Sequence, residues 1–338
     1  MPILEEFEAA PVRLFCGVKQ DRLPDLPESL LNSFYHELRE CDNNSAIYKH
    51  FHREKVNEQI ILGEQIDNNN ITCLDKTETN NNISAIMNQS LQSSLIKRIN
   101  KIKYPIKDCC DKIFNEKIVC DNVFLKERET FKCKSEWINE RQFKVTGSRC
   151  YDIYTYSLDD WITKSSKYFW PTSNPSGKAV TDGVKNEKPT RNKYSEITGA
   201  YIEETGLIIC QTEPWLAYST DGVVMKDSKV DRLLEIKCPF EIENLEEKTI
   251  LKKCNRYIKK DKKTGVIYLN KKHKYFAQIQ LGMALLNINK CDFVLYSDLS
   301  QEVKIWTIPI DNDYAFKLLK TLKKNYFEKM LHNICTLE

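Results

Sequence analysis

The chain has 338 residues and a formal net charge of +3, and 41% of its residues are hydrophobic, which is enough for a sizeable hydrophobic core. No stretch approaches the roughly 20 consecutive apolar residues of a membrane-spanning helix. The acidic beginning lacks the basic and then apolar pattern of a signal peptide. We therefore expect an intracellular protein, nuclear or cytoplasmic, that does not enter membranes. The 13 cysteines are scattered and contain no Cys-x-x-Cys, which argues against a disulfide scaffold or a zinc ribbon.

Residues 1–132 do not show the pattern of a packed domain. Asparagine is frequent at 67–70 and 80–82, and residues 88–94 are nearly all polar, so we expect a linker in this part of the chain. One or two short helices are expected within residues 23–39. The sequence therefore predicts an N-terminal region, 1–132, that is partly disordered or linker and whose function it does not indicate.

Residues 133–338 are expected to form an α/β domain. Residues 137–156 have helical character, interrupted by the turn signal Thr146-Gly147-Ser148. Proline suits the first turn of a helix and glycine its C-terminal cap, so a helix is expected from Pro189 to Gly199. The further expected elements are strands at 203–211, 221–226 and 232–238, an amphipathic helix at 275–286, a hairpin of strands 291–297 and 302–310, and a last helix capped by Asp313.

The most informative segment is the strand at 232–238. Its alternation directs Glu235 and Lys237 to one face of an otherwise apolar strand. Charged residues are uncommon in such a strand, so a functional role is expected for them. If Asp221 lies on the neighbouring strand, the two carboxylates can bind a hard divalent cation, while Lys237 orients or deprotonates the attacking water and offsets charge on a phosphate. This combination is typical of a hydrolase for phosphodiesters.

Each part of this pattern also has a simpler explanation. Asp221-Gly222 alone is more often a hairpin turn than a metal ligand. Glu235 and Lys237 alone are more often an ion pair of an edge strand. It is their combination, with apolar flanks and a Cys-Pro-Phe end, that favours the site.

At this spacing the residues resemble the Asp…Glu-x-Lys signature of the PD-(D/E)XK nuclease superfamily. Three motifs in this order resemble, more narrowly, the YqaJ viral recombinase or phage lambda-type exonuclease family. They are Pro-Trp-Leu-Ala-Tyr-Ser-Thr-Asp221-Gly, Leu-Leu-Glu235-Ile-Lys237-Cys-Pro-Phe and Tyr275-Phe-Ala-Gln278-Ile-Gln280-Leu-Gly-Met. The resemblance covers about residues 133–335. It implies a restriction-endonuclease-like fold, with a mixed central sheet flanked by helices, and a DNA exonuclease that uses Mg²⁺ or Mn²⁺.

The resemblance also assigns roles to single residues. Asp221 and Glu235 match the metal-binding carboxylates, and Lys237 matches the catalytic lysine. Gln278 and Gln280 match the following helix motif; because residues two apart on a helix do not share a face, we expect Gln278 to line the site and Gln280 to pack or bind DNA.

A helical glutamate of the family corresponds to Glu187, seven residues before Tyr194. Proline disfavours the helical conformation of the residue before it, so Pro189 is expected to place Glu187 at the very start of its helix. Glu196 is the alternative metal ligand, and either glutamate could instead be a charge at a helix end.

The segment 137–149 resembles the family's opening motif, in which an arginine and a serine seven residues later bind the terminal phosphate of DNA. Arg141 and Ser148 have this spacing; the alternative is a surface arginine and a helix N-cap. Some related nucleases carry an iron–sulfur cluster on an upstream cysteine and a closely spaced trio near the C-terminus. Here only Cys291 and Cys335 lie late in the sequence, so we expect no such cluster.

Positive charge is concentrated in the C-terminal part of the chain. Residues 1–140 hold 19 Lys+Arg and 23 Asp+Glu (net −4), whereas residues 141–338 hold 32 and 25 (net +7). Residues 251–274 alone hold ten basic residues and one acid. Such a run is commonly a solvated loop, but it can also contact phosphates, and we assign DNA binding to Lys259, Lys260, Lys262 and Lys263.

These observations favour a metal-dependent exonuclease on double-stranded DNA with a recombination-type role, of viral or mobile-element origin. The alternatives are an endonuclease on the same fold and a catalytically silent DNA-binding module. A single-strand annealing protein as partner and a homo-oligomer are further expectations from the resemblance.

Overall fold

The structure is a computed structural model that describes residues 73–171 and 178–337. The contacts divide the chain into two compact units, residues 1–71 and residues 72–338, and all described residues belong to the second. The short helices predicted within 23–39 and the asparagine-rich stretch 67–70 lie outside the described residues. The boundary between residues 132 and 133 stays a prediction about where the nuclease domain begins.

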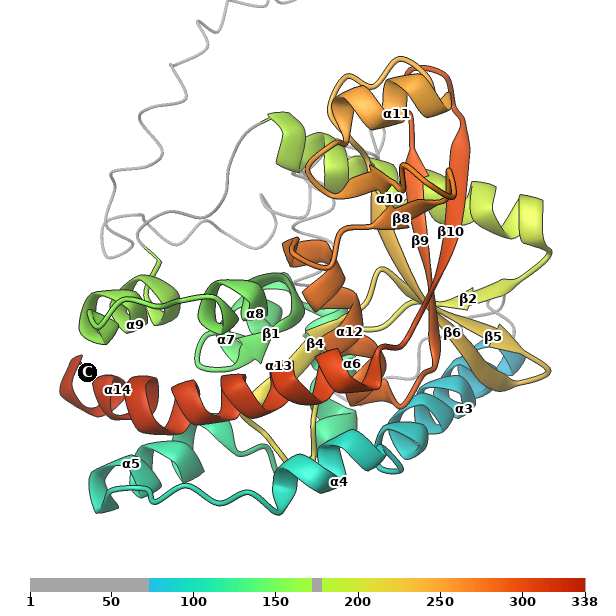
Figure 1. The fold of residues 1–338 in the computed structure, drawn as a ribbon. Coiled ribbons are helices and arrows are strands. Elements are labelled where there is room, and N and C mark those ends of the chain that lie inside the picture. Colours follow the sequence, from blue (N-terminus) through green and yellow to red (C-terminus); the bar gives the residue numbers. More distant parts are fainter. Residues whose placement is uncertain (1–72, 172–177, 338) are drawn as a thin grey trace, which may run out of the picture. The chain divides into compact units, whose positions relative to one another are not determined.

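A five-stranded mixed sheet forms the centre of the second unit, with the strand order β10-β9-β6-β5-β2 (Figure 1). Strand β6 pairs parallel with β9, whereas the other neighbouring pairs are antiparallel. The strands are β2 (Tyr201–Glu203), β5 (Gly222–Lys226), β6 (Lys229–Lys237), β9 (Lys290–Tyr296) and β10 (Val303–Pro309).

Two smaller sheets accompany the central one. In the first, β4 (Leu216–Ser219) pairs parallel with β1 (Val145–Thr146) and antiparallel with β3 (Leu207–Ile209). The second is a hairpin of β7 (Ile258–Lys260) and β8 (Ile267–Leu269).

Helices surround these sheets, and none of those described is long and apolar enough to cross a bilayer. Two short π-helical segments, η3 (Phe114–Ile118) and η4 (Tyr326–Met330), interrupt them. The helices are α3 (Cys73–Ser90), α4 (Ser94–Asn100), α5 (Asp108–Ile113), α6 (Val123–Lys132), α7 (Lys134–Glu140), α8 (Gly147–Tyr154), α9 (Trp161–Phe169), α10 (Lys178–Thr198), α11 (Glu247–Lys253), α12 (Lys274–Leu286), α13 (Asn312–Asn325) and α14 (Leu331–Leu337).

Helices α10 and α12 cover opposite faces of the central sheet. Side chains alternate along β6, and Leu234 and Ile236 pack with Tyr194 of α10 in one apolar cluster. Leu233 belongs to the main core, which contains most of α12. Glu235 lies two residues after Leu233, so the two side chains are on the same face of β6 and the Glu235 carboxyl group lies on the α12 side of the sheet.

The predicted fold class is confirmed: a mixed central sheet is flanked by helices. The predicted hairpin is β9 and β10, and the helix predicted at 275–286 is α12. The strand predicted at 203–211 is wrong as one element, because β2 and β3 belong to different sheets. Gly206 lies between them and packs so tightly on α6 that a Cβ atom would come within 2.2 Å of the Glu127 carbonyl oxygen. The helix predicted after Asp313 begins as α13, and its N-cap is Asp311 instead of Asp313.

The linker predicted at 80–82 and 88–94 is also wrong, because these residues lie in or beside α3 and α4. Their polar side chains bond to distant parts of the same unit. The Asn82 amide donates to Glu203 at 3.0 Å, and the Ser93 hydroxyl donates to the Ala284 carbonyl of α12 at 2.6 Å. These polar side chains thus bond to buried partners, and composition alone cannot distinguish such residues from solvated ones.

Candidate active site

The end of β6 and the start of β5 bring Asp221, Glu235 and Lys237 together. The register pairs Gly222 with Leu234, so Asp221 and Glu235 are neighbours across the two strands. The Lys237 Nζ lies 2.5 Å from Glu235 Oε1 and 3.6 Å from Asp221 Oδ2. Asp221 is fixed further, because its Oδ2 accepts a hydrogen bond from the Ile236 backbone N–H at 2.7 Å.

Glu235 is fully buried and held by two neutral side chains in addition to Lys237. The Gln278 amide donates to its Oε1 at 2.6 Å, and the Tyr218 hydroxyl donates to its Oε2 at 3.1 Å. The Tyr218 ring fits between Gly147 and Gly282, where a Cβ atom on either glycine would come within 2.4 Å of it. The sequence reading did not single out Tyr218, although it lies in the motif that ends at Asp221.

Burial sets the charges at this site. It raises the pKa of Glu235 above its ordinary value, and Lys237 offsets only part of that effect. Burial alone would lower the pKa of Lys237, but the carboxylates of Glu235 and Asp221 outweigh it and raise this pKa. Lys237 is therefore a cation in this arrangement, suited to orienting water and offsetting charge more than to accepting a proton.

Glu187 lies near the same carboxylates, but not in the expected way. Helix α10 begins at Lys178, so Glu187 is inside it and Pro189 does not mark its start. The helix continues through the proline because Asn186, Thr190 and Tyr194 are buried in the fold, and the Thr190 hydroxyl donates to the Asn186 carbonyl at 2.6 Å. Packing thus outweighs the local preference of the residue before proline.

Burial, and next the charge of Asp221, raise the pKa of Glu187 to about 7. Lys237 lowers it in part, so this lysine is a shared counter-ion of three carboxylates. Glu187 on α10, Asp221 directly before β5 and Glu235 on β6 offer the carboxylate oxygens that a hard divalent cation prefers. Glu196, the alternative, is 67% exposed and pairs with Lys193 at 3.5 Å, away from these groups.

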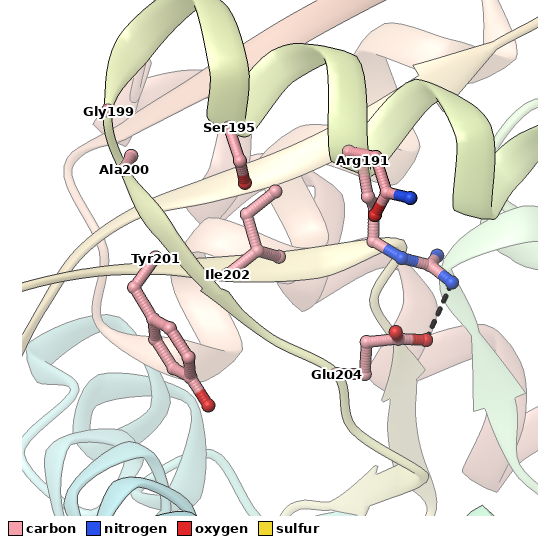
Figure 2. Close-up of a pocket in the computed structure, with 8 residues that line it drawn as sticks. Arg191, Ser195, Gly199, Ala200, Tyr201, Ile202 and Glu204 are labelled. Atoms are coloured by element: carbon pink, nitrogen blue, oxygen red, sulfur yellow. Dashed lines mark ion pairs between the residues drawn. The ribbon is translucent and has the colours of Figure 1, made fainter.

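Arg191, one turn after Glu187, was not predicted from the sequence. Its guanidinium pairs with Glu204 at 2.6 Å and donates to the Asp221 carbonyl oxygen at 3.1 Å. Figure 2 shows the ion pair at a pocket between α10 and β2 that Gly199 and Ala200 also line. Arg191 therefore ties α10 to the backbone of Asp221 and holds Glu187 and Asp221 in place relative to each other.

The two glutamines of α12 have different surroundings, as predicted. Gln278 bonds to Glu235, as described above. Gln280, expected to pack or to bind DNA, is fully buried. Its amide donates to the Pro309 carbonyl at 3.1 Å and its carbonyl accepts from the Asp311 N–H at 2.7 Å. The DNA-binding assignment of Gln280 is thus wrong, because both polar atoms hold α12 to the turn between β10 and α13.

Arg141 and Ser148 are brought together at a cavity between α7, α8 and α9. The Arg141 Nη2 donates to Ser148 Oγ at 3.0 Å, and its guanidinium lies 4.0 Å from the ring centre of Trp137. Burial, and next the charge of Arg149, lower the pKa of Arg141 to about 10. Within residues 73–171 and 178–337, no carboxylate lies within ion-pair distance of Arg141. The cavity is also lined by Lys164, Lys167 and Lys274.

The basic segment forms the exposed hairpin β7–β8 between β6 and α12. Lys259, Lys262 and Lys263 are exposed at this hairpin. Lys260 forms an ion pair with Glu247 of α11, so its charge is less available to bind a phosphate. The Asp261 carboxylate accepts from the N–H groups of Lys263 and Thr264, so the one acid of the segment shapes the turn.

Comparison with known proteins agrees with these motifs. The YqaJ-like viral recombinase domain matches residues 136–288, whereas no curated protein matches the chain. Among solved structures, the chain is similar to an alkaline exonuclease (LHK-Exo) from Laribacter hongkongensis, with 24% identity, coverage of 60% of this chain and 95% of that one, and a TM-score of 0.45. The same enzyme in complex with dAMP has 24% identity, coverage of 60% and 100%, and a TM-score of 0.44.

A phage-related exonuclease from Haemophilus somnus 129PT has 12% identity, coverage of 58% and 96%, and a TM-score of 0.42. The matched family range contains Arg141, Asp221, Glu235, Lys237 and Gln278. The resemblance inferred from three motifs is thereby confirmed. Residues 136–288 of this chain match the model of the YqaJ-like viral recombinase domain.

Proposed function

We propose that this chain is a metal-dependent exonuclease that hydrolyses phosphodiester bonds at the ends of double-stranded DNA in a recombination-type process. The observation that carries the proposal is the cluster of Asp221, Glu235 and Lys237 at the paired ends of β5 and β6. It lies inside a YqaJ-like viral recombinase domain. A single-strand annealing partner and a homo-oligomer stay predictions of the family resemblance.

Glu187, Asp221 and Glu235 would hold the divalent ion, for which we propose Mg²⁺ or Mn²⁺. Such an ion polarises a phosphoryl oxygen and lowers the pKa of a bound water. Lys237 stays protonated beside these carboxylates, so its ammonium group offsets the negative charge that builds on the phosphate. Gln278 and Tyr218 hold the Glu235 carboxylate by one oxygen each and so fix its direction. Positioning and charge are thus supplied by residues of β4, β6, α10 and α12 and by Asp221 directly before β5.

The test of the function is incubation with end-labelled linear duplex and closed circular DNA, with Mg²⁺, with Mn²⁺ and with a chelator. We expect metal-dependent release of nucleotides from linear DNA and intact circles. Cutting of the circles would assign an endonuclease instead. Binding without any hydrolysis would assign a silent DNA-binding module.

Preference for a 5′-phosphate is expected from the cavity at Arg141 and Ser148. A guanidinium beside a hydroxyl, with no carboxylate partner among the described residues, can bind a terminal phosphate. Charge-assisted bonds of this kind contribute about 1.5–3 kcal/mol each, or roughly ten- to a hundredfold. Arg141→Ala should therefore remove most of the difference in initial rate between duplexes with phosphorylated and hydroxyl 5′ ends. Metal binding should be unchanged.

Arg98→Ala is the matched control for this change. Arg98 also stacks on an aromatic ring, that of Phe316, at 3.8 Å, but it lies on α4. This variant should keep the preference. Equal rates on both kinds of end in the unchanged protein would remove the phosphate-binding role from Arg141.

The hairpin β7–β8 is expected to contribute sequence-independent affinity for DNA. Replacing Lys259, Lys262 and Lys263 with glutamine should flatten the plot of log affinity against log salt by roughly 0.9 per lost phosphate contact. Lys260→Gln should have a smaller effect, because Glu247 already pairs with Lys260. The control is the same change of charge at the exposed residues Lys317, Lys320 and Lys324 of α13. A salt slope that the hairpin variant leaves unchanged would make the hairpin a solvated loop.

A further inference from the structure

Three cysteines and a histidine meet where α5 contacts α14. Cys109 and Cys110 lie in α5, and His332 and Cys335 lie in α14, far away in sequence. Their ligand atoms, three Sγ and one imidazole nitrogen, all lie within 4.8 Å of one another. Figure 1 shows α14 at the C-terminal end of the long α13–α14 rod, with α5 near it.

The distances within this cluster match the ligand shell of a single tetrahedral ion. With Zn–S of about 2.3 Å and Zn–N of about 2.0–2.1 Å, tetrahedral ligands lie about 3.8 Å apart for two sulfurs and about 3.6 Å apart for sulfur and nitrogen. The Sγ atoms of Cys109 and Cys110 are 4.0 Å apart, and the His332 Nδ1 lies 3.6 Å and 3.4 Å from them. Three of the four ligand atoms therefore already lie close to tetrahedral separations, and all four lie within 4.8 Å of one another.

Hydrogen bonding alone does not explain this arrangement. A neutral imidazole nitrogen carries either one hydrogen or one lone pair, so Nδ1 has one strong hydrogen bond to make, yet two sulfurs lie at nearly equal distances from it. The Cys335 Sγ completes the group and contacts the Cys109 carbonyl oxygen at 3.4 Å. Three sulfur ligands and one nitrogen ligand that converge on one point are the arrangement that binds a metal ion such as zinc.

Local backbone geometry supports the same conclusion. His332 and Cys335 are three residues apart, so they share one face of α14. The π-helical segment η4 directly precedes this helix, and one extra residue in a helix rotates the following face by about 100°. A second π-helical segment, η3, directly follows α5. Irregular turns thus border both ligand-bearing helices, and the one before α14 sets the direction of the face that carries His332 and Cys335.

We propose that Cys109, Cys110, His332 and Cys335 form a structural zinc site that joins α5 to α14. A Cys₃His set is a closed tetrahedral site with no open position, so its role is to hold the fold together and not to catalyse. The spacing of these residues did not predict the site, because a pair of adjacent cysteines and a His-x-x-Cys 222 residues further on do not have the spacing of a zinc ribbon. The site is independent of the proposed nuclease function.

The test is the metal content of the purified full-length chain after dialysis against a mild chelator that removes ions from carboxylate sites. We expect about one zinc ion per chain, and loss of that zinc together with a lower melting temperature in Cys110→Ser and in His332→Ala. Asp221→Asn should keep the zinc, and this result would show that the zinc is not bound by the carboxylates of the candidate active site. Replacement by Co²⁺ should give the visible absorption of a tetrahedral thiolate complex.

Cys133→Ser is the matched control, because Cys133 is an exposed free cysteine outside the cluster; it should keep both zinc and stability. Zinc content that is equal in the control and in both cluster variants would overturn the proposal. Purified protein without zinc, or with the visible absorption of an iron–sulfur cluster that Cys110→Ser removes, would also overturn it.

Discussion

Replacing Glu235 with glutamine is expected to reduce DNA hydrolysis by roughly a thousandfold or more. The exchange keeps the shape of the side chain but removes a charge from a fully buried position that Lys237, Gln278 and Tyr218 all contact. Metal-ion stabilisation of the transition state is worth several kcal/mol, and about 1.4 kcal/mol is a factor of ten in rate. Asp221→Asn should have a comparable effect.

Lys237→Ala should also nearly abolish hydrolysis but for a different reason. It removes the ammonium group that faces the phosphate and leaves the carboxylates in place, so Mn²⁺ binding measured by calorimetry well above neutral pH should be largely retained. In contrast, Glu235→Gln and Asp221→Asn should weaken that binding. The combined measurement therefore separates a metal ligand from a group that acts on the phosphate.

Glu243→Gln, at an exposed glutamate close after β6, is the matched control and should keep full activity and metal binding. Full hydrolysis by the Glu235→Gln protein, or by the unchanged protein in a chelator, would contradict the proposed site.

The strand pattern was sufficient to predict the centre of this site. Alternation in β6 places Glu235 and Lys237 on one face whatever the tertiary context. The two-residue turn at Asp227 and Ser228, both with positive φ, joins β5 to β6 and sets the register that brings Asp221 opposite Glu235. Local rules therefore predicted which residues meet, and the family resemblance added Gln278 on a helix that no local rule connects to β6.

Contacts between distant segments were not predictable in this way. Arg191 reaches the Asp221 backbone only because α10 packs across the sheet, and α10 itself passes through a proline that local preference places at its start. Gln280 has the polarity of a DNA contact, but tertiary packing buries it against Pro309. Composition likewise predicted a linker where Asn82 and Ser93 bond to distant segments of the fold. In each case the deciding partner lies far away in sequence.

The metal-free protein is expected to lose stability as the pH rises from about 5 to about 7. The folded-state pKa of Glu187 is raised to about 7, and that of Glu235 is also raised. Between the ordinary value near 4.5 and 7, the folded state therefore binds more protons than the unfolded state, and the free energy of unfolding falls as these protons leave. Adding Mn²⁺ near neutral pH should restore the stability, because the ion binds the charged carboxylates of the folded state only.

Glu187→Gln tests which role this glutamate has, since the two roles predict opposite signs. If Glu187 is a carboxylate crowded by Asp221 in a metal site, its neutral replacement should raise the melting temperature of the metal-free protein near pH 7, by roughly 2–4 °C for each kcal/mol gained, while hydrolysis falls. Its side chain is 38% exposed, so solvent screening limits the gain to about 1 kcal/mol. Below about pH 5 the gain should vanish, because Glu187 is then already protonated. If Glu187 instead serves only its ion pair with Arg191, at 4.0 Å, the replacement should lower the melting temperature and spare hydrolysis.

Glu196→Gln is the matched control, because Glu196 lies on the same helix at a more exposed position. This replacement should change neither the melting temperature nor the rate.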